Sequence, residues 1–207
     1  MAISAAKENI LKRIRQALSN PVPLPFPQSE GNTSVFLPPS DELEIIFAEE
    51  FTKLQGKFAF CISEQDLQVQ LQQLITSKEW SKIYCSEDKW NPQFSNTINL
   101  PGCDASITGC EYLVARTGSI VMSAAQQSGR TVSVYAPVHI CIAYTNQLVY
   151  DLRDALQCVK ERYGSNIPSL ITFASGPSRT ADIEKTLVTG VHGPKEVYLF
   201  LVDSAGC

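Results

Sequence analysis

Two neighbouring stretches near the C-terminus carry the densest pattern in this sequence: Ile171-Thr172-Phe173-Ala174-Ser175-Gly176-Pro177-Ser178-Arg179-Thr180-Ala181-Asp182-Ile183-Glu184 and Gly190-Val191-His192-Gly193-Pro194. The first opens with a β-rich apolar run, which predicts a buried strand. Gly176-Pro177 then predicts a turn, because glycine tolerates positive φ and proline fixes φ. The residues that follow are of the types that cap a helix, so a strand, a turn and a helix start are predicted in that order. This order is typical of α/β folds.

The predicted helix start is also a candidate anion site. Backbone N–H groups and the helix dipole attract negative charge at a helix N-terminus, and open α/β sheets place ligand sites at such turns. Arg179 adds a charged fork suited to carboxylate or phosphate. We therefore predict ligand binding by Ser178, Arg179, Thr180 and Asp182. The alternative is a well-capped turn, with Arg179 in solvent or paired to Asp182.

His192 and Glu184 are the candidate catalytic residues. His192 is one of two histidines in the chain and is flanked by Val191 and Gly193 in a loop before the last predicted strand. A histidine in such a loop can act as a general acid or base, or bind an anion or a metal. The alternative is a histidine that only fixes the turn. For His139, which lies on an alternating strand, the structural role is favoured.

A second informative turn is Thr117-Gly118-Ser119. Its glycine permits close backbone approach and its hydroxyls can donate to a ligand, so Thr117 and Gly118 are further candidate binding residues. Arg130 follows Gly129 and can join Arg179 in binding an acid; an ordinary surface arginine is the alternative.

The double motif, Ser175 to Glu184 followed by Gly190 to Pro194, resembles the signature of the LUD-domain family of lactate utilization proteins. The resemblance extends from Asp104 to Val202. Because the chain lacks iron–sulfur cysteines, it is most similar to the lactate utilization protein C branch. The resemblance implies a three-layer α/β/α, Rossmann-like fold of the NagB/RpiA/CoA-transferase-like group, with a mostly parallel sheet.

One position departs from the family pattern. Members often carry an acidic residue just before the Thr-Gly pair, where this chain has Arg116. If that carboxylate were a nucleophile, as in CoA transferases, this chain would lack it, and Glu111 or Glu184 would be the remaining stand-ins. Asp104 resembles the family's acidic residue before Ile-Thr and is expected to cap a turn or support the site.

The chain-wide charge and composition exclude several classes. A formal net charge of −4 and a pI near 5.2 argue against nucleic acid or an anionic membrane as the main partner. No apolar run has the length of a membrane span. Residues 1–20 are basic but lack a continuous apolar core, so they are not a signal peptide. We expect a cytoplasmic protein.

The seven cysteines form no C-x-x-C pair, and most lie in apolar contexts. This pattern is typical of reduced, buried thiols and gives no support for a zinc or iron–sulfur site. Motifs for ATP, dinucleotides, zinc proteases and the α/β-hydrolase nucleophile are absent from the sequence. We therefore expect no metal and no evident cofactor in this chain.

The pattern of apolar residues predicts an N-terminal region, 1–40, and a domain, 41–207. The first consists of an amphipathic helix over 3–18 and a linker with prolines at 21, 23, 25, 27, 38 and 39. In the second, strands alternate with helices, which favours a parallel sheet. Helices are predicted at 41–55, after Ser63 and at 148–163, and strands at 57–62, 82–85, 105–108, 119–122, 131–136, 139–144, 169–174 and 196–202.

Three functions remain open on the sequence. The resemblance implies an accessory subunit of a system that oxidises L-lactate to pyruvate, with iron–sulfur subunits as partners and a small carboxylate or phosphorylated ligand. A second possibility is a stand-alone transferase or ligase acting on a CoA ester, a sugar phosphate or a folate. The third is a scaffolding subunit whose N-terminal helix and linker bind another chain.

Overall fold

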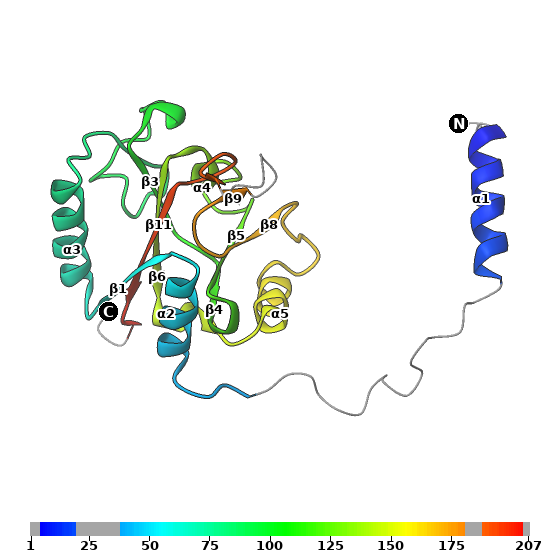
Figure 1. The fold of residues 1–207 in the computed structure, drawn as a ribbon, viewed down its shortest axis with the longest axis horizontal. Helices are drawn as coiled ribbons and strands as arrows, with labels where there is room; N and C mark the ends of the chain where they lie inside the picture. Colours follow the sequence, from blue (N-terminus) through cyan, green and yellow to red (C-terminus); the bar gives the residue numbers. More distant parts are fainter. Residues whose placement is uncertain (1–4, 20–37, 181–187, 205–207) are drawn as a thin grey trace. The chain divides into compact units, whose positions relative to one another are not determined.

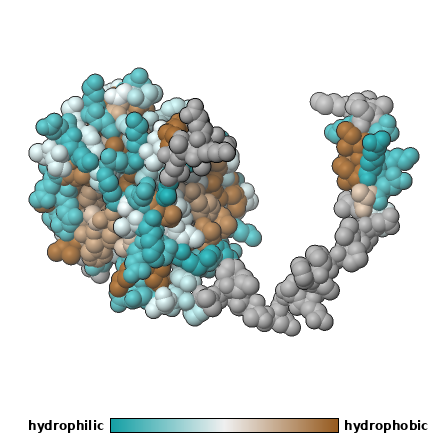
Figure 2. Space-filling view, in the orientation of Figure 1, coloured by the Kyte–Doolittle hydropathy of each residue, from teal (hydrophilic) through white to brown (hydrophobic). Residues whose placement is uncertain are grey.

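The computed structural model describes residues 5–19, 38–180 and 188–204. The chain divides into two compact units, residues 1–38 and 39–207, and each is described by itself. The first unit contains α1 (Ala5–Leu18), which confirms the predicted amphipathic helix. Ile10 and Ile14 are exposed, and Figure 2 shows a hydrophobic stripe on α1. Nearly all of the predicted proline-rich linker lies outside the described residues.

The second unit is built on a five-stranded sheet. In spatial order its strands are β1 (Lys57–Cys61), β11 (Glu196–Val202), β6 (Val138–Tyr144), β3 (Ala105–Thr108) and β2 (Ile83–Cys85). Every neighbouring pair is parallel, which confirms the prediction of an α/β fold with a parallel sheet. The last strand of the chain lies inside this sheet (Figure 1). Residues 197–202 are all buried, as expected for a parallel strand covered on both faces.

Helices cover both faces of the parallel sheet (Figure 1). The helix α3 (Glu64–Ser77) packs its buried leucines against a cluster that includes Phe200 of β11. The helix α2 (Leu43–Lys53) packs against the other face, in a cluster that includes Leu199. Neighbouring residues of β11 thus face opposite helices, as strand geometry requires. The predicted cap of α3 is confirmed, because the Ser63 hydroxyl accepts a hydrogen bond from the Asp66 amide.

A second sheet lies on the α2 side of the parallel sheet. In spatial order it contains β7 (Leu148–Val149), β4 (Tyr112–Val114), β5 (Ser119–Ser123) and β8 (Ile171–Ala174). Leu113 and Ile120 of this sheet share a buried cluster with Leu199 and Phe47. The helix α5 (Leu152–Tyr163) covers its outer face through Ala155, which packs with residues of β4 and β5.

This second sheet corrects part of the sequence prediction. The strand predicted at 169–174 does not continue the parallel sheet, because β8 pairs antiparallel with β5. It is also half-buried rather than buried. Residues 112–114, for which no strand was predicted, form β4. Residues 148–149 form β7, so the helix predicted from 148 begins only at Leu152. The capping box of Asp151 and Asp154 sets this later start.

The strand predicted at 131–136 is also wrong. Residues Val132–Tyr135 form a single helical turn, α4, in which the amides of Val134 and Tyr135 both donate to the Thr131 carbonyl. The β-branched residues that suggested a strand instead form the turn that leads, through Pro137, into β6. Three short 3₁₀ turns complete the described core: η1 (Leu100–Gly102), η2 (Ala115–Thr117) and η3 (Thr145–Gln147).

Candidate functional site

The loop after β8 turns sharply against the end of α2. Gly176 has a φ of 90°, and a Cβ atom there would lie 2.5 Å from the carbonyl oxygen of Leu54. Only glycine combines this conformation with this close approach. The Gly-Pro turn predicted from the sequence is therefore a point of contact between the second sheet and α2.

The chain after this turn forms a hairpin in place of the predicted helix start. Residues 179–180 form β9 (Arg179–Thr180), which pairs antiparallel with β10 (Val188–Thr189). Thr180 is half-buried in this hairpin. The helix-dipole argument therefore does not apply to Ser178, Arg179 and Thr180. Asp182 and Glu184, the other predicted residues of this turn, lie outside the described residues.

The two sequence motifs contact each other directly. The Ser178 amide donates to the Pro194 carbonyl (2.9 Å), and the Gly190 amide donates to the Ser178 carbonyl (2.9 Å). A Cβ atom at Gly193 would lie 2.9 Å from Cβ of Ser178. Residues 175–178 and 190–194, called the two motif loops below, are thus held side by side at the start of β11.

A cavity of about 250 Å³ opens between the two motif loops. Its wall includes Ser178 and His192 from the loops, Ser133 from α4 and the strand residues Met122 and Val197. No Asp or Glu of the described residues lines it. The cavity therefore offers hydroxyls and imidazole, with no carboxylate to repel an anion.

His139 closes the floor of this cavity. Its side chain is 1% exposed, and Nε2 lies 2.8 Å from Oγ1 of Thr108. Burial lowers the pKa of His139 from 6.5 to about 4, so the imidazole is neutral at pH 7. Each nitrogen of a neutral imidazole donates or accepts a hydrogen bond according to the tautomer.

A wider groove of about 510 Å³ adjoins the cavity. Val134, His192 and Gly193 line both hollows. The groove adds mostly apolar residues, among them the exposed Tyr135, and one cation, Lys195. Lys195 makes no ion pair with a described residue, and its stem packs so closely on Gly190 that a Cβ atom there would collide with it.

Three predicted residues lie elsewhere or serve the fold. Arg179 is exposed and donates to the Leu54 carbonyl, and Arg130 donates to the Ser169 hydroxyl. Neither lines the cavity or the groove. Gly118 has a φ of 55°, and a Cβ atom there would lie 2.5 Å from the Phe51 amide nitrogen. The absence of a side chain at Gly118 therefore allows the backbone of α2 to pack against this turn.

Thr117 has an indirect connection to the site. Its hydroxyl lies 2.8 Å from the Ser119 hydroxyl, which lies 2.6 Å from the hydroxyl of Ser175. Ser175 lines the cavity. Thr117 therefore ends a chain of hydroxyls that fixes the first motif loop against β5.

The acidic and basic residues near the second turn are paired. Arg116 forms an ion pair with Asp151, which caps α5. The carboxylate of Glu111 is 2% exposed and accepts hydrogen bonds from three groups: Ser123, Arg162 and Tyr163. A carboxylate that is buried and bonded in this way holds the fold and does not face a ligand. Neither Glu111 nor Arg116 lines the cavity.

Asp104 joins two distant segments and does not cap a turn of its own, the role that the sequence had allowed. Its carboxylate accepts hydrogen bonds from the amides of Lys82 and Ser81, both 2.8 Å long. These two amides hold the pKa of Asp104 below its usual value. The residue ties the start of β3 to the start of β2, away from the motif loops.

The sequence did not identify three residues of the site. His139 was assigned to the core, and Tyr135 and Lys195 were not considered. His139 could have been found as the single charged or amide-like residue in the apolar strand residues 138–143, and Lys195 as the cation directly after the second motif. Tyr135 carries no such signal, because its exposure depends on α4 being a turn.

The cavity lies at the amino ends of β6 and β11, since His139 and Val197 are each the second residue of their strand. Ligand sites of open α/β sheets usually lie at the carboxyl ends. The cavity thus lies at the opposite edge of the parallel sheet from the one where such folds usually bind ligands. The first motif follows β8, which belongs to the second sheet and not to the parallel one.

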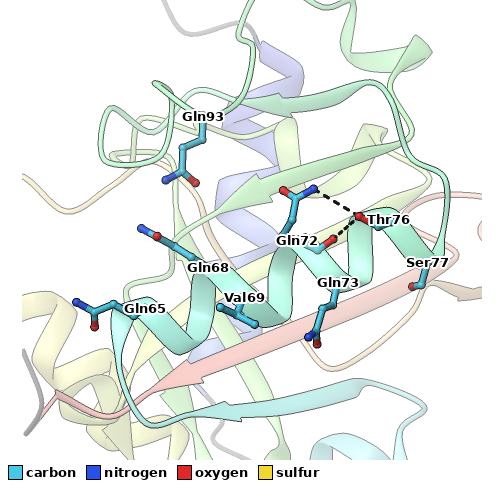
Figure 3. A pocket seen from close by; sticks show the side chains of 8 residues that line it. All are labelled: Gln65, Gln68, Val69, Gln72, Gln73, Thr76, Ser77 and Gln93. Atoms are coloured by element: carbon cyan, nitrogen blue, oxygen red, sulfur yellow. Dashed lines mark hydrogen bonds between the residues drawn. The ribbon is translucent and has the colours of Figure 1, made fainter.

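A larger hollow, about 880 Å³, lies on the exposed side of α3. Figure 3 shows its glutamines along the helix, with Gln93 facing them from a neighbouring loop. No titratable side chain lines it, and its two hydroxyls, those of Thr76 and Ser77, donate to backbone carbonyls of α3. It is the weaker candidate for a site.

In residues 5–19, 38–180 and 188–204, no three His, Cys, Asp or Glu residues are grouped so that they could hold a metal ion. The six described cysteines are free, and five of them are buried. Within the same part of the chain, no helix has the length and apolar character needed to cross a membrane.

Comparisons with known proteins place the motif loops inside a recognised domain. A family model described as the LUD domain matches residues 93–202. The chain is 32% identical to lactate utilization protein C of Bacillus velezensis over 63% of this chain and 56% of that protein. It is 35% identical to lactate utilization protein C of Deinococcus radiodurans over 50% of this chain and 48% of the relative. The chain spans about half the length of the curated relatives it matches.

The fold itself has a solved counterpart. The crystal structure of a DUF162 family protein from Deinococcus radiodurans superposes with a TM-score of 0.58 and 18% sequence identity. The match covers 77% of this chain and 96% of that chain. At this identity the likeness establishes a shared fold.

Proposed function

This chain belongs to the LUD domain family, and we propose that it is an accessory subunit of a lactate utilization system that binds a small anionic ligand between its two motif loops. The system oxidises L-lactate to pyruvate. The names of the relatives support the first half of this proposal. The geometry of the site supports the second half.

One observation carries the ligand site. Two sequence motifs that are separated along the chain meet through backbone hydrogen bonds, and the cavity between them has a buried, neutral histidine at its floor. A neutral imidazole that lines a cavity can donate to an anion or accept from its hydroxyl, according to its tautomer.

The proposed ligand contacts follow from the cavity lining. Ser178 and His192 offer a hydroxyl and an imidazole from the loops, and His139 lines the same cavity from β6. Thr117 supports the first loop through Ser119. For Arg179 and Thr180 we propose a structural role, in the strand β9 that follows the first motif loop. For Asp182 and Glu184, ligand binding and catalysis are proposed from the sequence alone.

The wider assignment is proposed on the same basis. The parallel sheet flanked by helices is compatible with the NagB/RpiA-like group, to which we assign it. Redox chemistry is assigned to iron–sulfur partner subunits, because this chain has no cysteine motif for a cluster. A pull-down with a tagged full chain from cells grown on lactate tests this. Recovery of iron–sulfur proteins supports the subunit role, and recovery of the chain alone contradicts it.

The alternative, a stand-alone transferase or ligase, receives less support from the described residues. A CoA-transferase mechanism needs a carboxylate that can attack a substrate. Glu111 is enclosed by Ser123, Arg162 and Tyr163, and the position before the Thr-Gly pair holds Arg116. Turnover of an acyl-CoA, a sugar phosphate or a folate by the isolated chain would favour this alternative.

A thermal-shift titration tests the ligand site. L-lactate, pyruvate and inorganic phosphate are titrated against the wild type, His192→Ala and Gln68→Ala. The last variant changes an exposed residue on α3, away from the cavity. A ligand that binds only the native state raises the melting temperature by mass action. We expect one of the anions to stabilise the wild type and Gln68→Ala but not His192→Ala. Equal shifts in all three proteins, or none, would contradict the site.

A further inference from the structure

The two edges of the parallel sheet are protected to different degrees. At one edge, Ser95 lies beside β2: its carbonyl accepts from the Cys85 amide (3.0 Å) and its amide donates to the Ile83 carbonyl (3.3 Å). At the other edge lies β1, and no described strand pairs with its outer side. Unpaired N–H and C=O groups on an edge strand are a template for another strand, so proteins usually cover such edges or place charges on them.

The outer side of β1 can be assigned to particular residues. The Cys61 carbonyl accepts from the amide of Asp203, which follows β11, so it points into the sheet. Because successive residues of a strand direct their backbone groups to opposite edges, Phe58 and Phe60 present theirs outward. The Phe60 carbonyl accordingly accepts from the Gln70 side chain of α3 (3.1 Å), a bond that the amide of another strand can replace. The outer edge thus offers two N–H and two C=O groups.

The side chains exposed at this edge are apolar. Phe60 is 43% exposed, and Ile62, directly after the strand, is 70% exposed. On the α3 side of β1 there is a hollow of about 390 Å³, whose wall includes Ala59 and Leu74. The strand carries a charge only at its first residue, Lys57. An apolar edge without a covering strand is of the kind that forms an interface.

We infer that β1 pairs antiparallel with β1 of a second copy of this chain, which joins the parallel sheets of the two copies into one. The two-fold axis passes beside Ala59. In this register both outward-facing residues of each copy are used, because Phe58 of one copy lies opposite Phe60 of the other and exchanges backbone hydrogen bonds with it. The inference goes beyond the proposed ligand site and is independent of it, since no residue of β1 lines the cavity.

The side chains of the edge match each other in the same register. Phe58 packs in the cluster on the α2 face of the sheet, and Phe60 shares that face because alternate residues of a strand point the same way. Each Phe58 therefore lies beside a Phe60 of the other copy, as a cross-strand aromatic pair. This match of the strand to itself favours a second copy over an unrelated strand.

The charges at the two ends of the edge are complementary. At the start of β1, Lys57 and Lys78 share one carboxylate, that of Glu196, so this end has an excess of positive charge. Just beyond the other end, the carboxylate of Asp66 accepts the Ile62 amide (3.0 Å) and makes no ion pair with a described residue. Antiparallel pairing brings the basic end of each copy towards the acidic end of the other.

Cross-linking of the full chain tests the register. Ala59→Cys places two thiols opposite each other, with Cα atoms about 4.5 Å apart, as in a non-hydrogen-bonded pair. This distance allows a disulfide, so oxidised glutathione is expected to give a covalent dimer on a non-reducing gel. Ile62→Cys is the control. Residue 62 is highly exposed, but its two copies would be about 20 Å apart in this register. We expect no covalent dimer from this variant or from the wild type.

Sedimentation velocity of the full chain tests the association itself. Over a wide range of concentration, the wild type is expected to approach twice the mass of one chain. Phe60→Lys places a charge in both aromatic pairs and should weaken dimerisation at least about tenfold. Leu156→Lys replaces a side chain of similar exposure, 46%, on α5 and away from β1, and should leave dimerisation unchanged. Circular dichroism verifies that both variants are folded.

Each outcome either supports or overturns the pairing. Cross-linking of Ala59→Cys but not of Ile62→Cys, together with a weaker dimer of Phe60→Lys, supports it. A wild type that stays monomeric at all concentrations overturns it, and the edge of β1 is then left to a strand of another protein. Equal cross-linking of the two cysteine variants, or a dimer unaffected by Phe60→Lys, also overturns it, because the copies would then meet elsewhere. All of these results leave the proposed ligand site standing.

Discussion

The Nε2 atom of His139 lies 2.8 Å from Oγ1 of Thr108, across the parallel pair of β6 and β3. This bond orients an imidazole that is 1% exposed and that also lines the cavity between the motif loops. A side chain in a packed strand thus belongs both to the core and to the candidate site. Its protonation should therefore affect the stability of the fold.

The buried His139 makes the protein sensitive to mild acid. Its pKa falls from 6.5 to about 4 on folding, so the unfolded chain takes up the proton first. The stability from this residue is complete above pH 6.5 and is lost as the pH falls towards 4. The loss in the free energy of unfolding is about 3 kcal/mol in total, since one pKa unit corresponds to about 1.36 kcal/mol. Urea unfolding from pH 7.5 to 4 measures it.

Two variants isolate this effect. His139→Gln keeps a polar side chain but does not titrate, so it should lack the additional loss between pH 6.5 and 4. His192→Gln removes the other, exposed histidine and should follow the wild type. Parallel curves for the wild type and His139→Gln would show that His139 is not buried in the neutral form.

Gly118 allows α2 to approach the second sheet. Gly118→Ala would place a Cβ 2.5 Å from the Phe51 amide nitrogen, which is backbone and cannot move aside alone. We expect a loss of about 3 kcal/mol in the free energy of unfolding, measured by urea titration. Gly129 has a similar φ of 61° with no atom near its Cβ position, so Gly129→Ala should cost only about 1 kcal/mol. Equal losses would contradict the close approach.

Asp151 should matter more than the arginine that pairs with it. Its carboxylate accepts the Arg153 amide at the start of α5, and Asp151→Ala should cost about 1–2 kcal/mol as the loss of a helix cap. The Arg116 side chain is 46% exposed, so Arg116→Ala should cost less than about 1 kcal/mol. Thermal unfolding compares the two variants. A larger effect of Arg116→Ala would indicate a role beyond this ion pair.

Glu196 gives the fold a second dependence on pH. Lys57 and Tyr198 donate to its carboxylate, and these bonds lower its pKa from 4.5 to about 2. Its contribution is present above pH 4.5 and is lost as the pH falls towards 2. Because the pair is about one-third exposed, solvent screening limits the contribution to about 1 kcal/mol. Glu196→Gln should be destabilised by that amount at pH 7, and the difference from wild type should vanish near pH 2.

Most of the parallel sheet was predictable because its strands have a local signal. Residues 196–202 and 138–144 are apolar runs, and the Ser63 cap marks the start of α3. The position of β11 between β1 and β6 was not predictable, since strand order depends on contacts between distant segments. The second sheet was missed for the same reason. Residues 112–114 and 148–149 are too short to show a period and become strands only by pairing with each other and with β5.

The candidate site was predicted in part. The two motifs were identified, and Ser178 and His192 do line one cavity. Arg179 was chosen for its charge, but its guanidinium bonds to the Leu54 carbonyl because the hairpin directs it towards α2. His139 was assigned to the core because a strand residue that is only buried and one that also lines a cavity have the same sequence pattern. Tertiary structure alone distinguishes the two roles.

The two histidines provide the most direct test, because the chain has no others and both line the cavity. Imidazole nitrogen NMR spectra of the ¹⁵N-labelled full chain are recorded during titration with L-lactate at pH 7. If the acid binds between the motif loops, the resonances of His139 and His192 shift together and saturate with one dissociation constant. A response of the exposed His192 alone, without saturation, or of neither histidine, would contradict a ligand site built from the two motif loops and the buried imidazole.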